Sequence, residues 1–523
     1  MIGLRLPSPP DPRSLYVFEW LFCVLGMPFE VLQDEKCRSD HLLLIQYGME
    51  PEGQKGPHIL FIPRFPHERQ NMGSPSAFIT FQGESIPLYG TWEIPPDGLP
   101  LVRYESGEPA ITKSGRTIRL GFDIVASMFH LLTLEGERKG VQDEQAIQQP
   151  VIDLYICVLK SLIEQCLLKQ GQPMVSKCLW PDGKRFAVFL SHDVDAVHRR
   201  EPFTIAVDLY RIVKAFVRGN VHKALGDART LCHLLFDDHD VYWNFDRWME
   251  LESRYNIRSS FYFLEGRRLA RYGRRYNAVT LKPVIQRLRD GGWEVGLHGS
   301  YAAWRDARQL KRERRALEKV AEVRIQGHRQ HYLHFDSEAS YQCYEETGLE
   351  YDSTLGYNHQ IGYRAGTSLP FHPYNRATGK KFHLLEIPLT VMDQAFLVDR
   401  IPTNALDKML TRTAANGGLF SLLWHQRTFA QKALYGHVVQ YALQQDGWIA
   451  TGAQVNTWWR AREACTYVYQ YNAQADTLQI TVSSACPKGL CFKIRSPREE
   501  NWVVPCQPGR QILNGMHIII EMT

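Results

Sequence analysis

Two aspartates separated by one residue follow a short apolar stretch of the sequence, FLSHDVDAVH, which runs from Phe189 to His198. Side chains at positions i and i+2 of a strand point to the same side, so we expect Asp193 and Asp195 to share one side near the end of a buried strand. Like charges this close repel each other unless a cation lies nearby. The pair therefore either faces water or serves a metal ion and a substrate.

Other polar residues stand where further apolar segments end. WEVGLHGSY supplies His298, IQGHRQHYLHFD supplies Arg329 and His331, and GLFSLLWHQ supplies His425. A single histidine or a single pair of aspartates is common in ordinary loops and cores. An ordered set at four strand ends is much less expected by chance, and in α/β barrels the carboxyl ends of the strands carry the active site.

The elements that must position these residues alternate between strand and helix. From Arg185 to about residue 462 this alternation predicts βαβ units in a parallel sheet or barrel. The expected helices cover residues 244–256, 281–292 and 305–324, and the expected strands cover residues 257–266, 293–300, 384–393 and 418–426.

Two further regions flank this part of the chain. Residues 1–175 mix expected helices (15–26 and 151–169) with expected strands (41–48, 58–64 and 77–82), which predicts an α/β domain of unknown role. The Pro- and Gly-rich segment 171–184 marks a boundary, after which the barrel domain is expected over 183–462. Residues 465–523 alternate apolar and polar positions, so a small all-β appendage that leans on the rest is expected.

Composition excludes several classes of protein. The excess of 61 Lys and Arg over 56 Asp and Glu gives a net charge of only +5, which is no argument for nucleic acid. The most apolar window, residues 15–32, contains Glu19 and Glu30, so no transmembrane segment is expected. Eleven scattered cysteines without a CxxC motif fit reduced thiols, and no signal peptide is apparent, so we expect a cytoplasmic protein. The oligomeric state is not predicted.

At this point the motifs carry a resemblance. Residues 185 to about 460 resemble the polysaccharide deacetylases of carbohydrate esterase family 4, and most closely a divergent branch whose first motif reads HDVD. The phrases that carry it, in order, are HDVD, YWNFDRWMELESRYNIRSSFYFLEG, EVGLHGSY, GHRQHYLHFD, YDSTLGY, IGYRAGT and LLWHQ. The resemblance covers about half of the chain and implies an incomplete (β/α) barrel.

The resemblance also implies a divalent metal, with zinc the expected ion. Asp195 and His298 match the aspartate and the first histidine of the family's metal site, but the second histidine of the HxxxH motif is replaced by Ala302. Catalytic zinc usually has three protein ligands. His331 is the candidate third ligand, with His328 and His334 as alternatives. A weak metal site, or no metal at all, remains open at this stage.

The same resemblance assigns the remaining roles. Asp193 matches the catalytic base, Arg329 the arginine that orients it, and Tyr332 the residue whose backbone N–H stabilises the oxyanion. His425 matches the general acid, and Asp393 stands where an orienting partner for that histidine is expected.

The implied function is therefore removal of an N-acetyl group from an amino sugar or a glycan precursor, in the synthesis of a cell-surface polysaccharide. Two alternatives stay open: hydrolysis of another C–N bond, in a cyclic imide or ureide, and carbohydrate binding without catalysis at a degenerate metal site. Aromatic residues such as Trp293, Tyr301, Trp304, Tyr363 and Trp424 suit a sugar cleft, but for any one of them a place in the core is the preferred interpretation.

Overall fold

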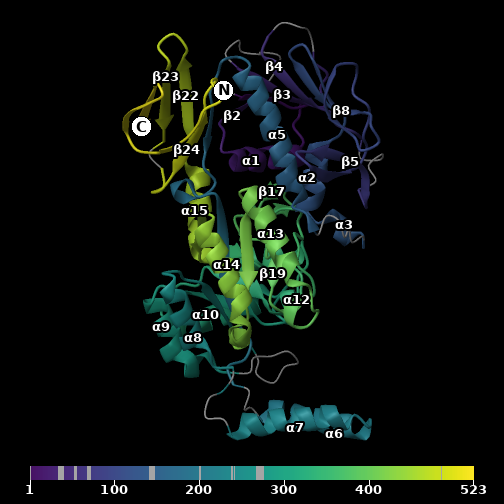
Figure 1. The fold of residues 1–523 in the computed structure, drawn as a ribbon, viewed down its shortest axis with the longest axis vertical. Coiled ribbons are helices and arrows are strands. Elements are labelled where there is room, and N and C mark those ends of the chain that lie inside the picture. Colours follow the sequence, from purple (N-terminus) through teal and green to yellow (C-terminus); the bar gives the residue numbers. More distant parts are fainter. Residues whose placement is uncertain are drawn as a thin grey trace.

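The computed structural model shows three regions that follow one another along the chain. In space, the amino- and carboxyl-terminal regions lie at one end of the molecule, the central region lies next to them, and a helical hairpin projects from the opposite end (Figure 1). The structure describes residues 2–522, with gaps at 33–40, 52–55, 67–71, 141–147, 199–201, 237–239, 241, 267–275 and 484–485.

The central region is built on one parallel sheet. Its strands lie in the order β18-β15-β14-β13-β12-β11-β20-β19, and β21 also pairs with β11. β18 and β19 form the two ends of this path, so the sheet curls without closing, as expected of an incomplete barrel. The strands are β11 (Phe186–Val194), β12 (Ser260–Leu264), β13 (Glu294–Gly299), β14 (Gly327–Gln330), β15 (Tyr351–Asp352), β18 (Leu385–Glu386), β19 (Val391–Met392), β20 (Leu419–Leu423) and β21 (Gly447–Ala450).

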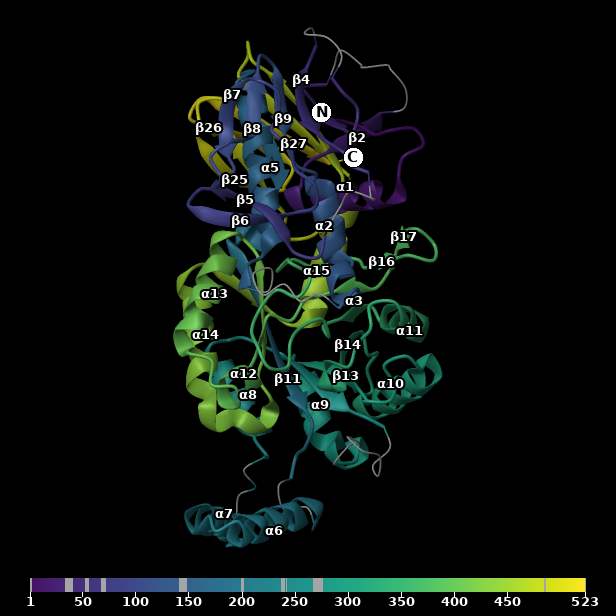
Figure 2. The ribbon, with the colours of Figure 1, turned by 90° about the vertical axis from the view of Figure 1, so that its right-hand side faces the viewer.

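Helices cover the outer face of this sheet (Figure 2). They include α8 (Phe245–Arg254), α9 (Lys282–Asp290), α10 (Ala307–Ala321), α11 (Ala339–Thr347), α13 (Thr403–Ala415) and α14 (Lys432–Gln444). The last helix, α15 (Gly452–Ala464), lies instead between the barrel and the amino-terminal region, where its buried residues join the core of the inner face. Apart from the strand expected over 384–393, the expected helices and strands of this region are present within a few residues of the predicted bounds.

One predicted strand of the barrel is wrong. Residues 384–393 were expected to form a single strand, but they form β18 and β19, which lie at opposite ends of the sheet. Pro388 lies between the two segments and has no N–H to continue a hydrogen-bonded ladder. The break separates the two strands and leaves Asp393 directly after β19.

Strand β11 is buried on both faces, as is usual for a strand in a covered parallel sheet. Phe186, Val188 and Leu190 pack in the core beneath the outer helices. Ala187 and Phe189 belong to a second core on the inner face of the sheet. The alternation places Asp193 on the inner face and His192 on the outer one.

The amino-terminal region holds a seven-stranded sheet in the order β2-β1-β3-β4-β9-β8-β7. The pairs β7–β8 and β8–β9 are antiparallel, and the other pairs are parallel. Its strands are β1 (Ile2–Arg5), β2 (Phe29–Leu32), β3 (Leu43–Tyr47), β4 (His58–Ile62), β7 (Leu99–Arg103), β8 (Pro109–Ser114) and β9 (Thr117–Leu120). A separate hairpin pairs β5 (Pro75–Phe81) with β6 (Glu84–Tyr89). The helices are α1 (Pro12–Leu25), α2 (Ile124–Leu132), α3 (Glu135–Arg138) and α5 (Val151–Leu168).

The carboxyl-terminal strands do not form one sheet. Four of them make a sheet in the order β22-β23-β27-β26, and the other two, β24 and β25, pair with β10 (Met174–Lys177). The tail strands are β22 (Tyr467–Asn472), β23 (Thr477–Val482), β24 (Cys491–Arg495), β25 (Asn501–Pro505), β26 (Gly509–Leu513) and β27 (Met516–Met522). The expected boundary segment 171–184 thus contributes a strand to the tail, and the division into three domains stays a prediction.

Arg462 of α15 joins the three regions. Its fully buried guanidinium donates to the carbonyl oxygens of Cys23 (2.6 Å), Val24 (3.3 Å), Lys177 (3.2 Å) and Cys178 (2.7 Å). One side chain therefore connects the end of α1 and the strand that pairs with the tail to the last helix of the barrel.

Replacing Arg462 by methionine keeps an unbranched side chain but removes the guanidinium donors from these buried carbonyls, of which that of Cys23 retains the N–H of Gly26. Each buried acceptor left unsatisfied costs about 1–3 kcal/mol, so we expect a clear fall in the midpoint of thermal unfolding in calorimetry. Arg312→Met is the matched control, because Arg312 is exposed and, among the described residues, donates only to Gln309 on its own helix. Equal midpoints for the two variants would contradict the assigned role.

Candidate metal centre

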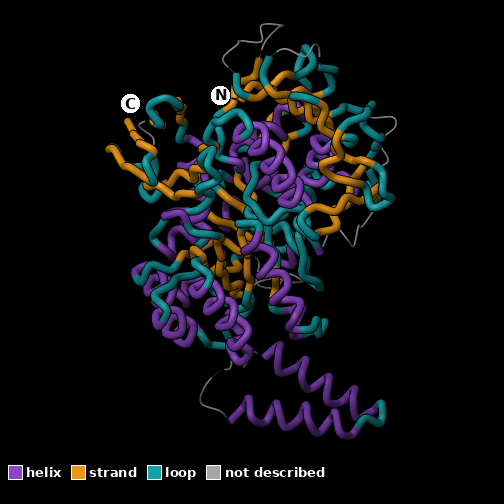
Figure 3. Tube along the Cα trace, turned by 45° about the horizontal axis from the view of Figure 1, so that its top comes forward, coloured by secondary structure: helices purple, strands orange, loops and turns teal. Residues whose placement is uncertain are grey.

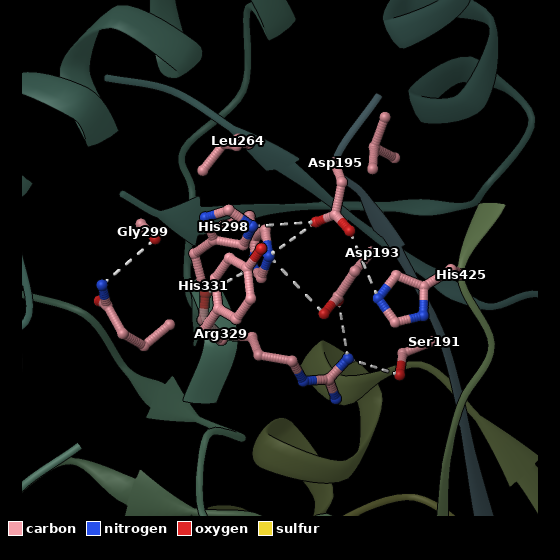
Figure 4. A network of polar contacts seen from close by, with 12 residues as sticks. Ser191, Asp193, Asp195, Leu264, His298, Gly299, Arg329, His331 and His425 are labelled. Carbon is pink, nitrogen blue, oxygen red and sulfur yellow. Dashed lines mark hydrogen bonds and ion pairs between the residues drawn. The ribbon is translucent and has the colours of Figure 1, made fainter. Parts of the chain in front are cut away.

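The polar residues identified in the sequence meet at the carboxyl ends of neighbouring strands. Strands β13 and β14 pair so that His298 lies beside Arg329, and β11 pairs with both β12 and β20. Because all these strands are parallel, their carboxyl ends lie along the same edge. Figure 4 shows the side chains of Asp193, Asp195, His298, Arg329, His331 and His425 turned toward one another.

Asp195, His298 and His331 form a cluster that can hold a metal ion. One ligand atom from each lies within 4.8 Å of the others. Oδ1 of Asp195 is 3.3 Å from Nε2 of His298 and 3.5 Å from Nε2 of His331. Two ligands on a tetrahedral zinc at about 2.1 Å would lie about 3.4 Å apart, so these separations fit a shared cation.

The unused atoms of the cluster point to the same conclusion. Oδ1 of Asp195 is buried and accepts no hydrogen bond among the described residues. Nδ1 of His298 lies 2.9 Å from the carbonyl oxygen of Arg329, so this nitrogen carries the proton and Nε2 keeps its lone pair for a metal. Burial lowers the pKa of His331 to about 4, which leaves that imidazole neutral and able to coordinate near pH 7.

The second oxygen of Asp195 is held by other groups. Nη1 of Arg427 lies 3.0 Å from Oδ2, and Nε2 of His425 lies 3.5 Å from it. Burial alone would raise the pKa of Asp195, but the nearby His298 and the charge of Arg427 hold it well below its usual range. The carboxylate is therefore ionised and presents Oδ1 alone to the cluster.

Asp193 lies next to the cluster and is fixed by an arginine. The guanidinium of Arg329 donates from Nη1 to Oδ1 of Asp193 at 3.0 Å and to Oγ of Ser191 at 2.8 Å. Arg329 is fully buried and also donates to the carbonyl and the hydroxyl of Ser353. Oδ2 of Asp193 remains on the side of the cluster, 3.8 Å from Nε2 of His298.

His425 forms the opposite wall of the site and is oriented by Asp393. Nδ1 of His425 donates to Oδ1 of Asp393 at 2.7 Å, and the backbone N–H of His425 donates to Oδ2 at 3.0 Å. Burial by itself would lower the pKa of His425, but the carboxylates of Asp393 and Asp195 raise it to about 9. The imidazole is therefore protonated at neutral pH, with Nε2 facing the site.

Asp393→Asn is expected to lower turnover by about a hundredfold or more, because loss of the carboxylate charge lowers the pKa of His425 and leaves less of the imidazole protonated at neutral pH. The binding of a metal should be unchanged, because Asp393 does not contact the cluster. The check is turnover measured alongside metal content. A variant with normal turnover would show that Asp393 does not position His425 for the reaction.

The other histidines near the motifs have different partners. His192 lies on the outer face, as the alternation predicted, 2.6 Å from the carbonyl of Trp424 and 3.0 Å from Glu252. His328 is bound to Asp352 at 2.7 Å, and Nδ1 of His334 lies 3.1 Å from the carbonyl of Tyr301. Neither alternative third ligand joins the cluster.

Two further residues of the family motifs, Ala302 and Tyr332, lie in the turns that follow β13 and β14. Ala302, which replaces the family's second histidine, is exposed in the turn after β13. Tyr332 directly follows His331 in a tight turn with φ 60° and is 51% exposed. The assignment of its backbone N–H to an oxyanion stays a prediction.

The aromatic residues separate into two groups. Trp293, Tyr363 and Trp424 are buried in the core. The indole N–H groups of Trp293 and Trp424 donate to Glu252 and to the carbonyl of Thr428, and the hydroxyl of Tyr363 is hydrogen-bonded to that of Thr413. The other group extends from the metal cluster as neighbouring rings at centroid distances of 4.5 Å (His331–Tyr332), 5.9 Å (Tyr332–Tyr301), 4.3 Å (Tyr301–His334) and 4.5 Å (His334–Trp304). The core interpretation is right for the first group, and only the second adjoins the site.

Sequence reasoning missed several contacts. Arg427 donates to Asp195, and the hydroxyl groups of Ser191 and Ser353 accept from Arg329, which in turn holds Asp193. Ser191 precedes Asp193 by two residues, so the strand alternation could have placed it on the same face. Arg427 and Ser353 carry no such signal, because short turns after β20 and β15 bring them back to the site.

No protein-family model matches the sequence, and no curated protein matches it significantly. Solved structures do. A protein described as a polysaccharide deacetylase from Mycobacterium smegmatis is 20% identical over 54% of this chain and 93% of its own, with a TM-score of 0.37. One from Pseudomonas aeruginosa PAO1 is 15% identical over 54% of this chain and 94% of its own, with the same score of 0.37.

A CE4 family pseudoenzyme from Bacillus anthracis is 12% identical over 53% of this chain and 66% of its own, with a TM-score of 0.29. Over about half of its length, this chain is similar to solved polysaccharide deacetylases. These structures carry the family name to which the motifs point, and the incomplete barrel is seen in the strand order of the sheet itself. Scores this low carry no weight for the reaction, and the functional assignment rests on the geometry of the site.

Proposed function

We propose that this chain is a metal-dependent hydrolase that removes an N-acetyl group from an amino sugar. The observation that supports this most is the separation of tasks around one cluster. Three side chains, Asp195, His298 and His331, can hold a divalent cation, and a carboxylate and an imidazole beside them are each fixed by a dedicated partner.

The donor set suits zinc, which prefers imidazole and carboxylate ligands in a site with one open position. When bound there, such a cation supplies a Lewis acid and a water molecule of lowered pKa. Ala302 does not leave the site short of ligands, because His331 would supply the third ligand, and the second nitrogen, from the next strand end.

The side chains of this chain then divide the proton transfers. Oδ2 of Asp193 accepts a proton from the water that attacks the acetamide carbonyl carbon, while Arg329 holds Oδ1 in place. His425 starts protonated and delivers the proton at Nε2 to the amine nitrogen as the C–N bond breaks. Acetate and the free amino sugar are the products. The backbone N–H of Tyr332 is the proposed donor to the oxyanion.

A carbohydrate substrate fits the row of rings beside the cluster. Tyr332, Tyr301 and Trp304 are half-buried or exposed and adjoin the ligand His331. Aromatic rings have an apolar face and a polar edge, which suits the apolar faces and hydroxyl rims of sugar rings. This row favours an N-acetylated sugar over a small cyclic imide or ureide, which would need less surface.

The test is release of acetate from a panel of N-acetylated mono- and oligosaccharides by the metal-loaded protein, with cyclic imides and ureides in parallel. The proposal expects acetate release that disappears in Asp193→Asn. Turnover of imides or ureides alone would assign the site to another C–N bond. Binding of sugars without turnover, at full metal occupancy, would make the chain a carbohydrate-binding protein.

A further inference from the structure

A pair of helices that the sequence analysis did not anticipate extends away from the body of the protein. α6 (Pro202–Val217) and α7 (Val221–Phe236) form an antiparallel hairpin, seen as two long helices beyond the barrel in Figure 3. The two helices pack against each other along small or branched residues such as Ala215 and Ala224, which are buried. We call residues 202–236 the hairpin.

The outer side of the hairpin is apolar and exposed to solvent. In α6, the exposed apolar residues recur at intervals of three and four, the spacing of one helical face. Phe216 is 67% exposed and Val217 is 79% exposed, so these side chains have no cover within the described chain. The exposed large apolar residues of the hairpin are Leu209, Tyr210, Val213, Phe216, Val217, Val221 and Leu225.

Basic residues lie beside this apolar face. The hairpin contains five Lys or Arg residues and two Asp, a net charge of +3. Lys214, Arg218 and Lys223 are all exposed and lie near the turn between the two helices, close in sequence to Phe216 and Val217 at the end of α6. An amphipathic helix with exposed aromatic and aliphatic residues on one face and basic residues on the other is typical of a segment that lies in the headgroup region of an anionic bilayer.

The hairpin is also attached at the edge of the sheet that carries the candidate site. β11, which carries Asp193, ends at Val194, and α6 begins at Pro202. The seven intervening residues span at most about 25 Å. The hairpin therefore lies beyond the carboxyl edge of the sheet, the edge that holds Asp195, His298 and His331 (Figures 1 and 2).

We propose that the hairpin binds the surface of an anionic lipid bilayer, with its apolar face in the headgroup region and its basic residues against the lipid phosphates. None of the described helices is long and apolar enough to cross a membrane. Attachment at this place brings the carboxyl edge of the barrel sheet, with the candidate metal centre, toward the bilayer. Resting on the proposed function, it makes a lipid-linked amino sugar the class of substrate.

An anionic membrane explains the exposed residues better than a second protein does. A protein partner would be expected to select a compact patch depleted of lysine, whereas here lysine and arginine flank the apolar residues. Tyr210, with an apolar ring and a polar hydroxyl, is the residue type enriched at membrane interfaces.

Co-sedimentation with vesicles tests the proposal on the full-length protein. The probes are vesicles of phosphatidylcholine alone and of phosphatidylcholine with about 30% phosphatidylglycerol. The intact protein should bind only the anionic vesicles, and the binding should weaken as salt is raised. Each basic residue near an anionic surface increases partitioning about fivefold, so the variant Lys214→Gln/Arg218→Gln/Lys223→Gln should lose about a hundredfold in binding.

A second variant, Val213→Ser/Phe216→Ser/Val217→Ser, should also lose binding, because it removes the apolar face and leaves the charge. The matched control is Arg308→Gln/Lys311→Gln/Arg315→Gln on α10, an exposed basic helix without an exposed apolar stripe, and it should bind normally. Binding of anionic vesicles that survives both hairpin variants would overturn the proposal. So would a dimer in sedimentation velocity that only the serine variant dissolves, since that result assigns the face to a second copy.

Vesicle binding is read without any turnover, so its failure is distinct from failure of the proposed hydrolase. A protein that binds vesicles but releases no acetate would retain the hairpin proposal and lose the reaction. A protein that releases acetate from soluble sugars but ignores anionic vesicles would retain the reaction and lose the hairpin proposal.

Discussion

Replacement of Asp193 by asparagine is expected to reduce turnover by about a thousandfold or more while leaving metal binding intact. Asparagine has the same shape, and its carbonyl oxygen can still accept from Nη1 of Arg329, which lies 3.0 Å from the carboxylate in the native protein. The variant loses only the capacity to take up a proton. Steady-state kinetics together with metal analysis of the same preparation measures both quantities.

Asp336→Asn is the matched control for this variant. Asp336 lies at the start of α11, where its carboxylate accepts from the backbone N–H groups of Glu338 and Ala339, and asparagine can make the same contacts. Normal turnover is expected there. If Asp193→Asn kept native turnover, or if it lost its metal along with turnover, Asp193 would not be the free base beside the cluster.

Replacement of His331 by alanine is expected to weaken metal binding by more than about a hundredfold and to stop turnover as a consequence. The estimate follows from the loss of one ligand in three, since even partners outside the coordination shell change affinity by about 10- to 100-fold. The measurement is the affinity for zinc, obtained by calorimetric titration of the metal-free protein. His334→Ala serves as the control, because His334 lies on the same segment but contacts the carbonyl of Tyr301.

This variant also decides between the sequence-level alternatives for the third ligand. If His331→Ala bound zinc as tightly as the native protein, a residue other than His331 would complete the site. If His334→Ala lost the metal instead, His334 would be the third ligand, and the cluster of Asp195, His298 and His331 in the structure would be wrong.

Much of the site could be predicted because parallel strands bring distant residues to one edge. The apolar run before Asp193 identifies β11, and the i, i+2 spacing assigns Asp193 and Asp195 to its inner side. The same reasoning placed His298 and His425 at the ends of β13 and β20. These inferences use only local periodicity, which a single sequence contains.

Contacts made through turns could not be predicted in this way. Arg427 reaches Asp195 because a 3-10 turn directly follows His425, and no local pattern specifies that return. The pairing of β10 with β24 joins residues more than three hundred positions apart, and neither strand is distinctive in its own composition. Long-range pairing depends on which edges remain open once the larger sheets have formed.

The hairpin is a different case, because its signal was present in the sequence. Leu209, Val213 and Phe216 show helical spacing within a basic segment. Periodicity alone does not say whether such a face is covered by the rest of the protein. Only the structure shows that it is left exposed.

Crystallography with anomalous scattering at the zinc edge tests the central claim most directly. The protein, purified and supplied with zinc, is predicted to show one anomalous peak between Oδ1 of Asp195, Nε2 of His298 and Nε2 of His331. Oδ2 of Asp193 should lie near this peak, with Arg329 still bound to Oδ1 of Asp193. A peak elsewhere, or a fully zinc-treated crystal with none at these three residues, would contradict the account.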